Sequence, residues 1–218
     1  MRGVNLSVGR GEKLVVFGRS GAGKRTFLRL AAGIAAPSSG GVTLNDPAPG
    51  RRMPVGYVTS EGGLLNNLTL LENAVLPVVY HGLLGRREAE AKGLALLAEW
   101  GLSAEAGRRP AEATPAGRRL AQLARALLAE PALYLLEDPL ADMDAAAAVT
   151  IWRALERIFA GGQACVILGT EKPGSYLDWG NRFLFIGEER ARIFDGRKAL
   201  LEDGDPEVGV FLRESIGG

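Results

Sequence analysis

The chain has 218 residues, with 26 Lys and Arg against 25 Asp and Glu, so its formal charge is +1. This length fits one domain with room for an inserted subdomain, and a hydrophobic content of 47% excludes a disordered chain. The balanced charge gives no bulk electrostatic reason to expect a nucleic-acid partner. A single cysteine excludes a disulfide framework. No apolar run approaches the roughly 18 residues that span a bilayer, and the charged amino terminus lacks the apolar stretch of a signal peptide. We expect a soluble intracellular protein.

The predicted elements alternate between strands and helices along most of the chain. Short apolar runs predict strands at 14–17, 42–44, 55–58, 133–136, 166–168, 182–186 and 191–194, with a weaker candidate at 4–8. Helical spacing predicts helices at 24–32 and 144–159, several within 69–129, and a last short one within 205–218. This order predicts an α/β fold with a mostly parallel sheet, interrupted by a helical insertion near 65–129.

A glycine-rich loop follows the first buried strand and opens the first helix. Its residues are Gly18, Arg19, Ser20, Gly21, Ala22, Gly23 and Lys24. Such a loop lets backbone N–H groups converge on phosphates, and a lysine at its end adds a cation. The pattern fails at its last position, where Arg25 replaces the Ser or Thr hydroxyl that holds Mg²⁺. Thr26 does not simply replace that hydroxyl, because one residue along a helix is a turn of about 100°. The loop therefore predicts phosphate binding with doubtful metal dependence.

Three further segments carry a family resemblance in their order and spacing. The sequences are NLTLLEN at 67–73, LARAL at 123–127 and LYLLEDPL at 133–140. Together with the loop, they resemble the nucleotide-binding subunit of an ABC transporter. The tail at 205–212 and the sequence GRR at 117–119 look most like the Mla/Mce phospholipid-transport branch of that family.

The resemblance implies a P-loop NTPase core that binds ATP, formed by 1–64 and 130–218, and a helical subdomain at 65–129. It implies transmembrane permease subunits as partners and a second nucleotide-binding subunit, in a heterodimer or a homodimer. It places the chain on the cytoplasmic face of the inner membrane. The apolar stretch 64–84 is either a permease docking surface or the first core helix of the insertion. The 17 residues before Gly18 hold no clear adenine-stacking strand, so the chain either begins late or lacks that platform.

Two carboxylates end the strand at 133–136 in an order opposite to that of the family. The family has an aspartate that serves the metal, followed by a glutamate that polarises water. Here Glu137 comes first and Asp138 second. Since adjacent strand residues point to opposite sides, we expect Glu137 to take the metal position and Asp138 the base position. Asp138 is one methylene short, and a misplacement of about 1 Å can cost roughly 100-fold in rate.

Other positions that the resemblance makes catalytic also depart from the family. Ser60 stands where a glutamine senses the metal and the γ-phosphate, and Glu171 stands where a histidine follows the strand. The Ser-Gly-Gly signature is replaced by residues 113–117, ATPAG, which predict Thr114 as a helix N-cap and Pro115 as the first helical residue. A proline offers no N–H to a phosphate.

Three interpretations of this pattern remain open. The first is an ABC subunit that binds nucleotide but hydrolyses it poorly or not at all. The second is a non-catalytic structural or regulatory partner with no need for nucleotide. The third is an active ATPase that tolerates the substitutions. Binding and turnover measurements separate them.

Overall fold

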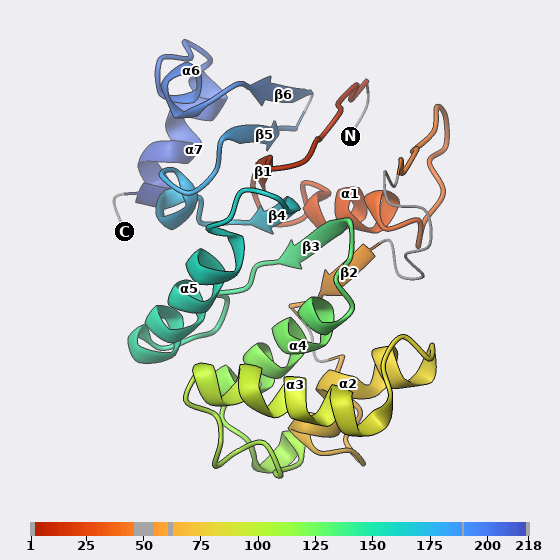
Figure 1. Ribbon diagram of the computed structural model, residues 1–218. Coiled ribbons are helices and arrows are strands. Elements are labelled where there is room, and N and C mark those ends of the chain that lie inside the picture. Colours follow the sequence, from red (N-terminus) through yellow and green to blue (C-terminus); the bar gives the residue numbers. More distant parts are fainter. Residues whose placement is uncertain (1–2, 46–54, 61–62, 189, 217–218) are drawn as a thin grey trace. The chain divides into compact units, whose positions relative to one another are not determined.

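The computed structural model describes residues 3–45, 55–60, 63–188 and 190–216 (Figure 1). The chain forms two compact units. The first unit contains Met1–Leu44, Leu135–Asp138 and Gly161–Gly218, and the second contains Asn45–Tyr134 and Pro139–Ala160. The predicted boundaries of a core and a helical subdomain at 65–129 stay a prediction.

The strands form one sheet in the order β2-β3-β4-β1-β5-β6. They are β1 (Lys13–Phe17), β2 (Val55–Val58), β3 (Leu133–Glu137), β4 (Cys165–Thr170), β5 (Arg182–Ile186) and β6 (Ala191–Phe194). β1 is parallel to β4 and to β5, and only the pairing of β5 with β6 is antiparallel among the registers described. Residues 14–17 of β1 are fully buried, as a strand between two parallel neighbours requires. The predicted α/β class with a mostly parallel sheet is confirmed.

The helices lie close to their predicted positions. They are α1 (Lys24–Ala31), α2 (Leu70–Tyr80), α3 (Arg86–Glu99), α4 (Pro115–Leu128), α5 (Ala145–Phe159), α6 (Arg197–Leu201) and α7 (Pro206–Ile216), with short 3-10 turns at Pro110–Glu112 and Gly174–Tyr176. In the first unit α1 packs closely on β4, since a Cβ at Gly169 would lie 3.0 Å from a methyl carbon of Leu28. α7 lies against β1 and β5 through Phe211, whose ring centroid is 5.7 Å from that of Phe17.

The second unit contains a helical cluster of α2, α3 and α4. Val75 and Val78 of α2 pack with Ala89 of α3, and Leu70 packs with Ala121 of α4. The apolar face of α2 is part of the core of this unit. This packing supports the prediction that the stretch 64–84 forms the first core helix of the insertion rather than a permease docking surface. Every helix in the described ranges is too short or too polar to span a bilayer.

Two predicted strands are wrong. Residues 42–44 form no strand, and the side chains of Val42 and Leu44 are 50% and 44% exposed. An apolar run becomes a strand only when a neighbouring strand pairs with it, and the described structure gives 42–44 none. The candidate at 4–8 is also an irregular extended segment. It alternates between exposed and half-buried residues, but side chains rather than a strand ladder hold it.

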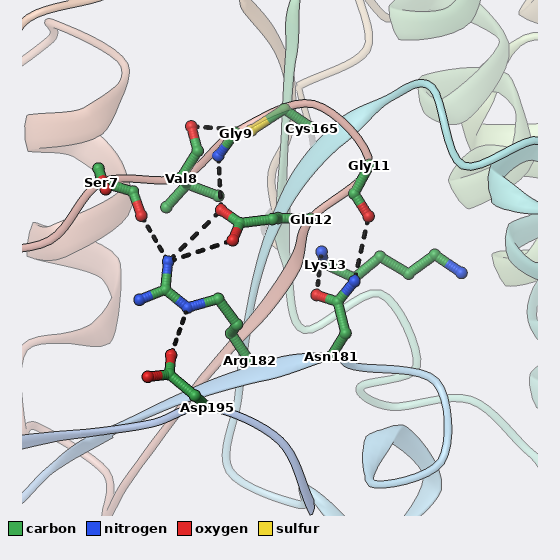
Figure 2. A network of polar contacts seen from close by, with 10 residues as sticks. All are labelled: Ser7, Val8, Gly9, Gly11, Glu12, Lys13, Cys165, Asn181, Arg182 and Asp195. Carbon is green, nitrogen blue, oxygen red and sulfur yellow. Dashed lines mark hydrogen bonds and ion pairs between the residues drawn. The ribbon is translucent and has the colours of Figure 1, made fainter.

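The side chain of Arg182 fixes that amino-terminal segment to the sheet (Figure 2). Its guanidinium donates to the carbonyl of Ser7 at 2.6 Å, lies 3.4 Å from Glu12, and donates to Asp195 at 2.9 Å. The Arg182 side chain is only 20% exposed. Asn181 beside it donates to the carbonyl of Gly11. The segment before β1 is therefore held by a largely buried cation.

We predict that Arg182→Met lowers the free energy of unfolding by about 2 kcal/mol, because a half-buried carboxylate loses its cation and a carbonyl loses its donor. The shift of the urea midpoint measures this loss. Arg197→Met is the matched control, since Arg197 pairs with Asp178 in an exposed ion pair, with side chains 51% and 80% exposed. It should cost less than about 1 kcal/mol. Equal shifts for the two variants would contradict the prediction.

Candidate functional site

The glycine-rich loop joins β1 to α1 within the first unit, as predicted. A Cβ at Gly18 would collide with the carbonyl oxygen of Ile186, so only glycine fits there. Gly23 is the N-cap of α1, with φ of 105° and no side-chain cap, and the first turn of α1 contains no acidic residue. The amino end of α1 thus keeps its partial positive charge. This geometry suits an anion bound by backbone N–H groups.

Lys24, at the start of α1, is turned back onto the loop. Its amine donates to the carbonyls of Gly18 and Arg19, both at 2.8 Å. It also lies 3.4 Å from a carboxylate oxygen of Glu171, at the end of β4. The Lys24 side chain is 12% exposed and that of Glu171 is 49% exposed. The substitution at position 171 therefore supplies a carboxylate directly to the loop lysine.

Arg25 is paired with the first of the two carboxylates that end β3. Its Nε lies 3.5 Å from Oε2 of Glu137, whose side chain is only 9% exposed. A nearly buried carboxylate of this kind needs a compensating cation. Thr26, the next residue of α1, is exposed. The residue that replaces the metal-holding hydroxyl is thus a cation bound to the predicted metal carboxylate.

Asp138 lies just beyond β3, in a different conformation from the one that the sequence predicts. Its φ is 36°, in the left-handed region that aspartate tolerates better than most residues, so the alternation of strand side chains stops at Glu137. The argument from strand alternation therefore does not apply to Asp138, and its role as the base stays a prediction. Its carboxylate accepts from the hydroxyl of Thr170 at 3.1 Å and from the N–H of Glu171 at 3.3 Å. The carboxylate therefore lies beside Glu171.

Burial raises the pKa of the Asp138 carboxyl above its usual value, and the charge of Glu171 adds to that rise. The two hydrogen bonds that Asp138 accepts, and the charge of Lys24, act in the opposite direction. The group is thus a partly desolvated carboxyl, and a second carboxylate beside it makes its ionised form less favourable.

A third ion pair at the loop was not predicted. Arg19 lies 3.1 Å from Glu214 of α7, with both side chains more than half exposed. Nothing in the sequence pattern links these residues, because the contact depends on how α7 packs against β1. Three cations of the loop region therefore each have a carboxylate partner within the first unit, namely Arg19, Lys24 and Arg25.

The remaining predicted positions lie in the second unit. The carbonyl of Ser60 accepts from the guanidinium of Arg119 on α4, at 3.2 Å. Arg119 also donates to the carbonyl of Thr59. Ser60 is thus held at the end of β2 by a largely buried arginine, through its backbone.

The start of α4 has the predicted cap and one additional carboxylate. Thr114 is the N-cap and accepts from the N–H of Gly117 at 3.0 Å, with Pro115 as the first helical residue. Glu105, from the preceding turn, accepts from the N–H of Thr114 at 2.9 Å, and a Cβ at Gly117 would lie 2.5 Å from its carboxylate. The amino end of this helix is therefore already covered by an anion of the chain itself. The sequence offered no signal for Glu105, which lies outside the helix.

Comparisons with known proteins agree with this fold. The model of the family described as ABC transporter matches residues 1–141. The lipoprotein-releasing system ATP-binding protein LolD of Saccharophagus degradans is 33% identical, with 78% of each chain covered. The aliphatic sulfonates import ATP-binding protein SsuB of Burkholderia pseudomallei is 35% identical over 90% of this chain and 58% of that relative.

Solved structures share the fold at lower identity. The ATP-binding cassette MJ0796, a dimer bound to ADP and Pi, has a TM-score of 0.75 and 24% identity, with 88% of this chain and 89% of that chain covered. The family match and the identity to LolD together show that this chain belongs to the ABC transporter family, as one of its ATP-binding domains.

Proposed function

We propose that this chain is a nucleotide-binding subunit of an ABC transporter that holds nucleotide at its loop but hydrolyses it poorly or not at all. The observation that carries the proposal is the ion pair between Arg25 and Glu137, at 3.5 Å. A side-chain cation takes the place that the family gives to Mg²⁺, while the backbone cradle of the loop is kept. The residues present do not fit a metal ion bound in the family's manner.

Several further contacts support weak catalysis. Glu171 lies on Lys24, where a γ-phosphate would need the lysine, and the carboxyl of Asp138 sits in a turn with a raised pKa. In the second unit, Ser60 is too short for the role of a glutamine. Each change removes part of the charge arrangement that stabilises a transition state, and such losses are large.

The transport role rests on the family and on the functions of the relatives. We propose permease subunits as partners, at the cytoplasmic face of the inner membrane. The proposal of a lipid or lipid-linked cargo draws on the likeness to a lipoprotein-releasing ATP-binding protein and on a tail that resembles the Mla/Mce branch, whereas the likeness to a sulfonate importer supports a different cargo. A structural or regulatory partner with no nucleotide requirement is the second candidate, because every cation at the loop already has an internal carboxylate.

We predict that nucleotide binding depends little on Mg²⁺. In wild type, the Kd for ATP measured by calorimetry should differ less than about threefold between excess EDTA and Mg²⁺, because the guanidinium of Arg25 takes over part of the metal's charge. Arg25→Ser should make binding metal-dependent, whereas Arg29→Ser, at an exposed position of the same helix, should not. Loss of all wild-type binding in EDTA, with recovery in Mg²⁺, would contradict the prediction. No binding in either condition would favour the second candidate.

We predict that the purified chain turns over ATP at least about 100-fold more slowly than a family member with an intact site. Asp138→Glu alone should not restore turnover, since Arg25 and Glu171 remain. Steady-state phosphate release measures the rate, and Lys24→Ala controls for contaminating ATPase. Rapid hydrolysis by the wild type that is abolished in Lys24→Ala would contradict the proposal that this chain hydrolyses nucleotide poorly or not at all.

We predict a heterodimer with a second, competent nucleotide-binding subunit. In the family, the loop of one subunit faces the signature of the other. At the amino end of α4, the carboxylate of Glu105 accepts the N–H of Thr114, and Pro115 has no backbone N–H to donate to a phosphate. A homodimer would therefore have two poor composite sites. A partner with an intact signature would give this chain's loop a better surface. Native mass spectrometry of the complex from its host checks the composition. Two copies of this chain, no other ATPase and brisk ATP-driven transport would refute this arrangement.

A further inference from the structure

The candidate site has two parts that differ in charge, a backbone cradle at the amino end of α1 and the region around Lys24 and Glu171. The backbone of the loop and the amino end of α1 form the first part, with no side-chain cap and no acid in the first helical turn. Backbone N–H groups in such a loop hold the phosphate nearest the helix, and the lysine reaches toward the terminal phosphates. In this chain the lysine amine is already bound by two loop carbonyls and by Glu171. The part of the site around Lys24, where the terminal phosphate would bind, therefore already contains the carboxylate of Glu171.

Geometry limits how far a terminal phosphate could stay from that carboxylate. The distance from Nζ of Lys24 to Oε1 of Glu171 is 3.4 Å. A phosphate oxygen bound to the same amine at about 2.8 Å would lie no more than about 6 Å from Oε1. Like charges at that separation repel, although the half-exposed position of Glu171 weakens the effect through solvent screening.

A second carboxyl group, that of Asp138, adds to the negative charge near the terminal phosphate. Asp138 accepts the N–H of Glu171 at 3.3 Å and the hydroxyl of Thr170 at 3.1 Å, so it faces the same end of the loop. Its N–H donates to the carbonyl of Gly169, which fixes the turn after β3 beside the end of β4. Arg25 offsets these charges only in part, because its guanidinium is shared with Glu137. A γ-phosphate would thus enter a region with two carboxyl groups, whereas a β-phosphate would meet the backbone cradle.

We infer that the loop selects nucleoside diphosphates over triphosphates, with Glu171 as the residue that sets the preference. This inference rests on the proposed nucleotide binding and deepens it by naming the ligand class. ADP places its β-phosphate in the cradle beside Lys24 and leaves the contact between Lys24 and Glu171 in place. ATP must displace Glu171 from the lysine or accept its charge nearby. The chain then holds a diphosphate in the absence of turnover.

The test compares ADP and ATP on the full chain by calorimetry in excess EDTA, which removes any difference due to metal. Wild type should bind ADP about tenfold more tightly than ATP, and Glu171→Gln should bring the two Kd values within about threefold of each other by strengthening ATP. Glu171→His should act in the same direction. The preference should shrink as salt is raised from 0.05 to about 0.5 M, because screening weakens the repulsion. Glu202→Gln removes an exposed carboxylate at the end of α6 and should leave both affinities unchanged.

The possible failures are distinguishable. If neither nucleotide binds, the proposed function fails. If ATP binds more tightly than ADP in wild type, or if Glu171→Gln changes both affinities equally, nucleotide binding stands and the diphosphate preference is overturned. Lys24→Ala should weaken both ligands, which assigns the measured binding to this loop. Competition by pyrophosphate against tripolyphosphate extends the test: a preference for pyrophosphate supports recognition of the phosphate chain, and a preference for tripolyphosphate contradicts it.

Discussion

The candidate site depends on the parallel pairing of β1 with β4 and β5. Phe17 is in register with Thr170 and with Phe185, so the loops after these strands begin at the same edge of the sheet. That register brings Glu171 to Lys24, although 147 residues separate them in the sequence. The N–H of Asp138 donates to the carbonyl of Gly169 and brings the end of β3 to the same edge. A substitution after β4 therefore acts directly on the lysine after β1.

Charge compensation within the first unit then determines what the loop offers a ligand. Glu137 is nearly buried, and a buried carboxylate without a cation is strongly destabilising. Arg25 supplies that cation from within the chain. Position 25 thus carries a guanidinium where the family has a hydroxyl, and this guanidinium pairs with Glu137. A phosphate likewise competes with the carboxylate of Glu171 for Lys24, which favours weak binding.

The sequence predicts the elements of the sheet well and the contacts of the site only in part. The runs at 182–186 and 191–194 coincide with β5 and β6, because alternation and burial act locally. The run at 42–44 failed because a strand needs a partner that the run itself cannot reveal. The loop residues and the unusual Arg25 and Glu171 were also visible in the sequence. Their ion pairs were not, since a pairing between distant segments depends on strand register, and Glu105 and Glu214 belong to no motif.

A carboxylate of the chain itself lies at two places where the family binds phosphate. In the first unit Glu171 lies on the lysine of the loop, and in the second unit Glu105 accepts the N–H of Thr114 at the start of α4. In an ABC dimer the loop and the start of that helix belong to two different composite sites. A single local substitution accounts for only one of these contacts, because they lie in separate units with separate sequence neighbours. Two independent positions that would receive phosphate thus carry an internal anion, while the cradle and the helix cap around them are preserved. This arrangement supports the proposal that the subunit serves nucleotide-linked assembly rather than hydrolysis.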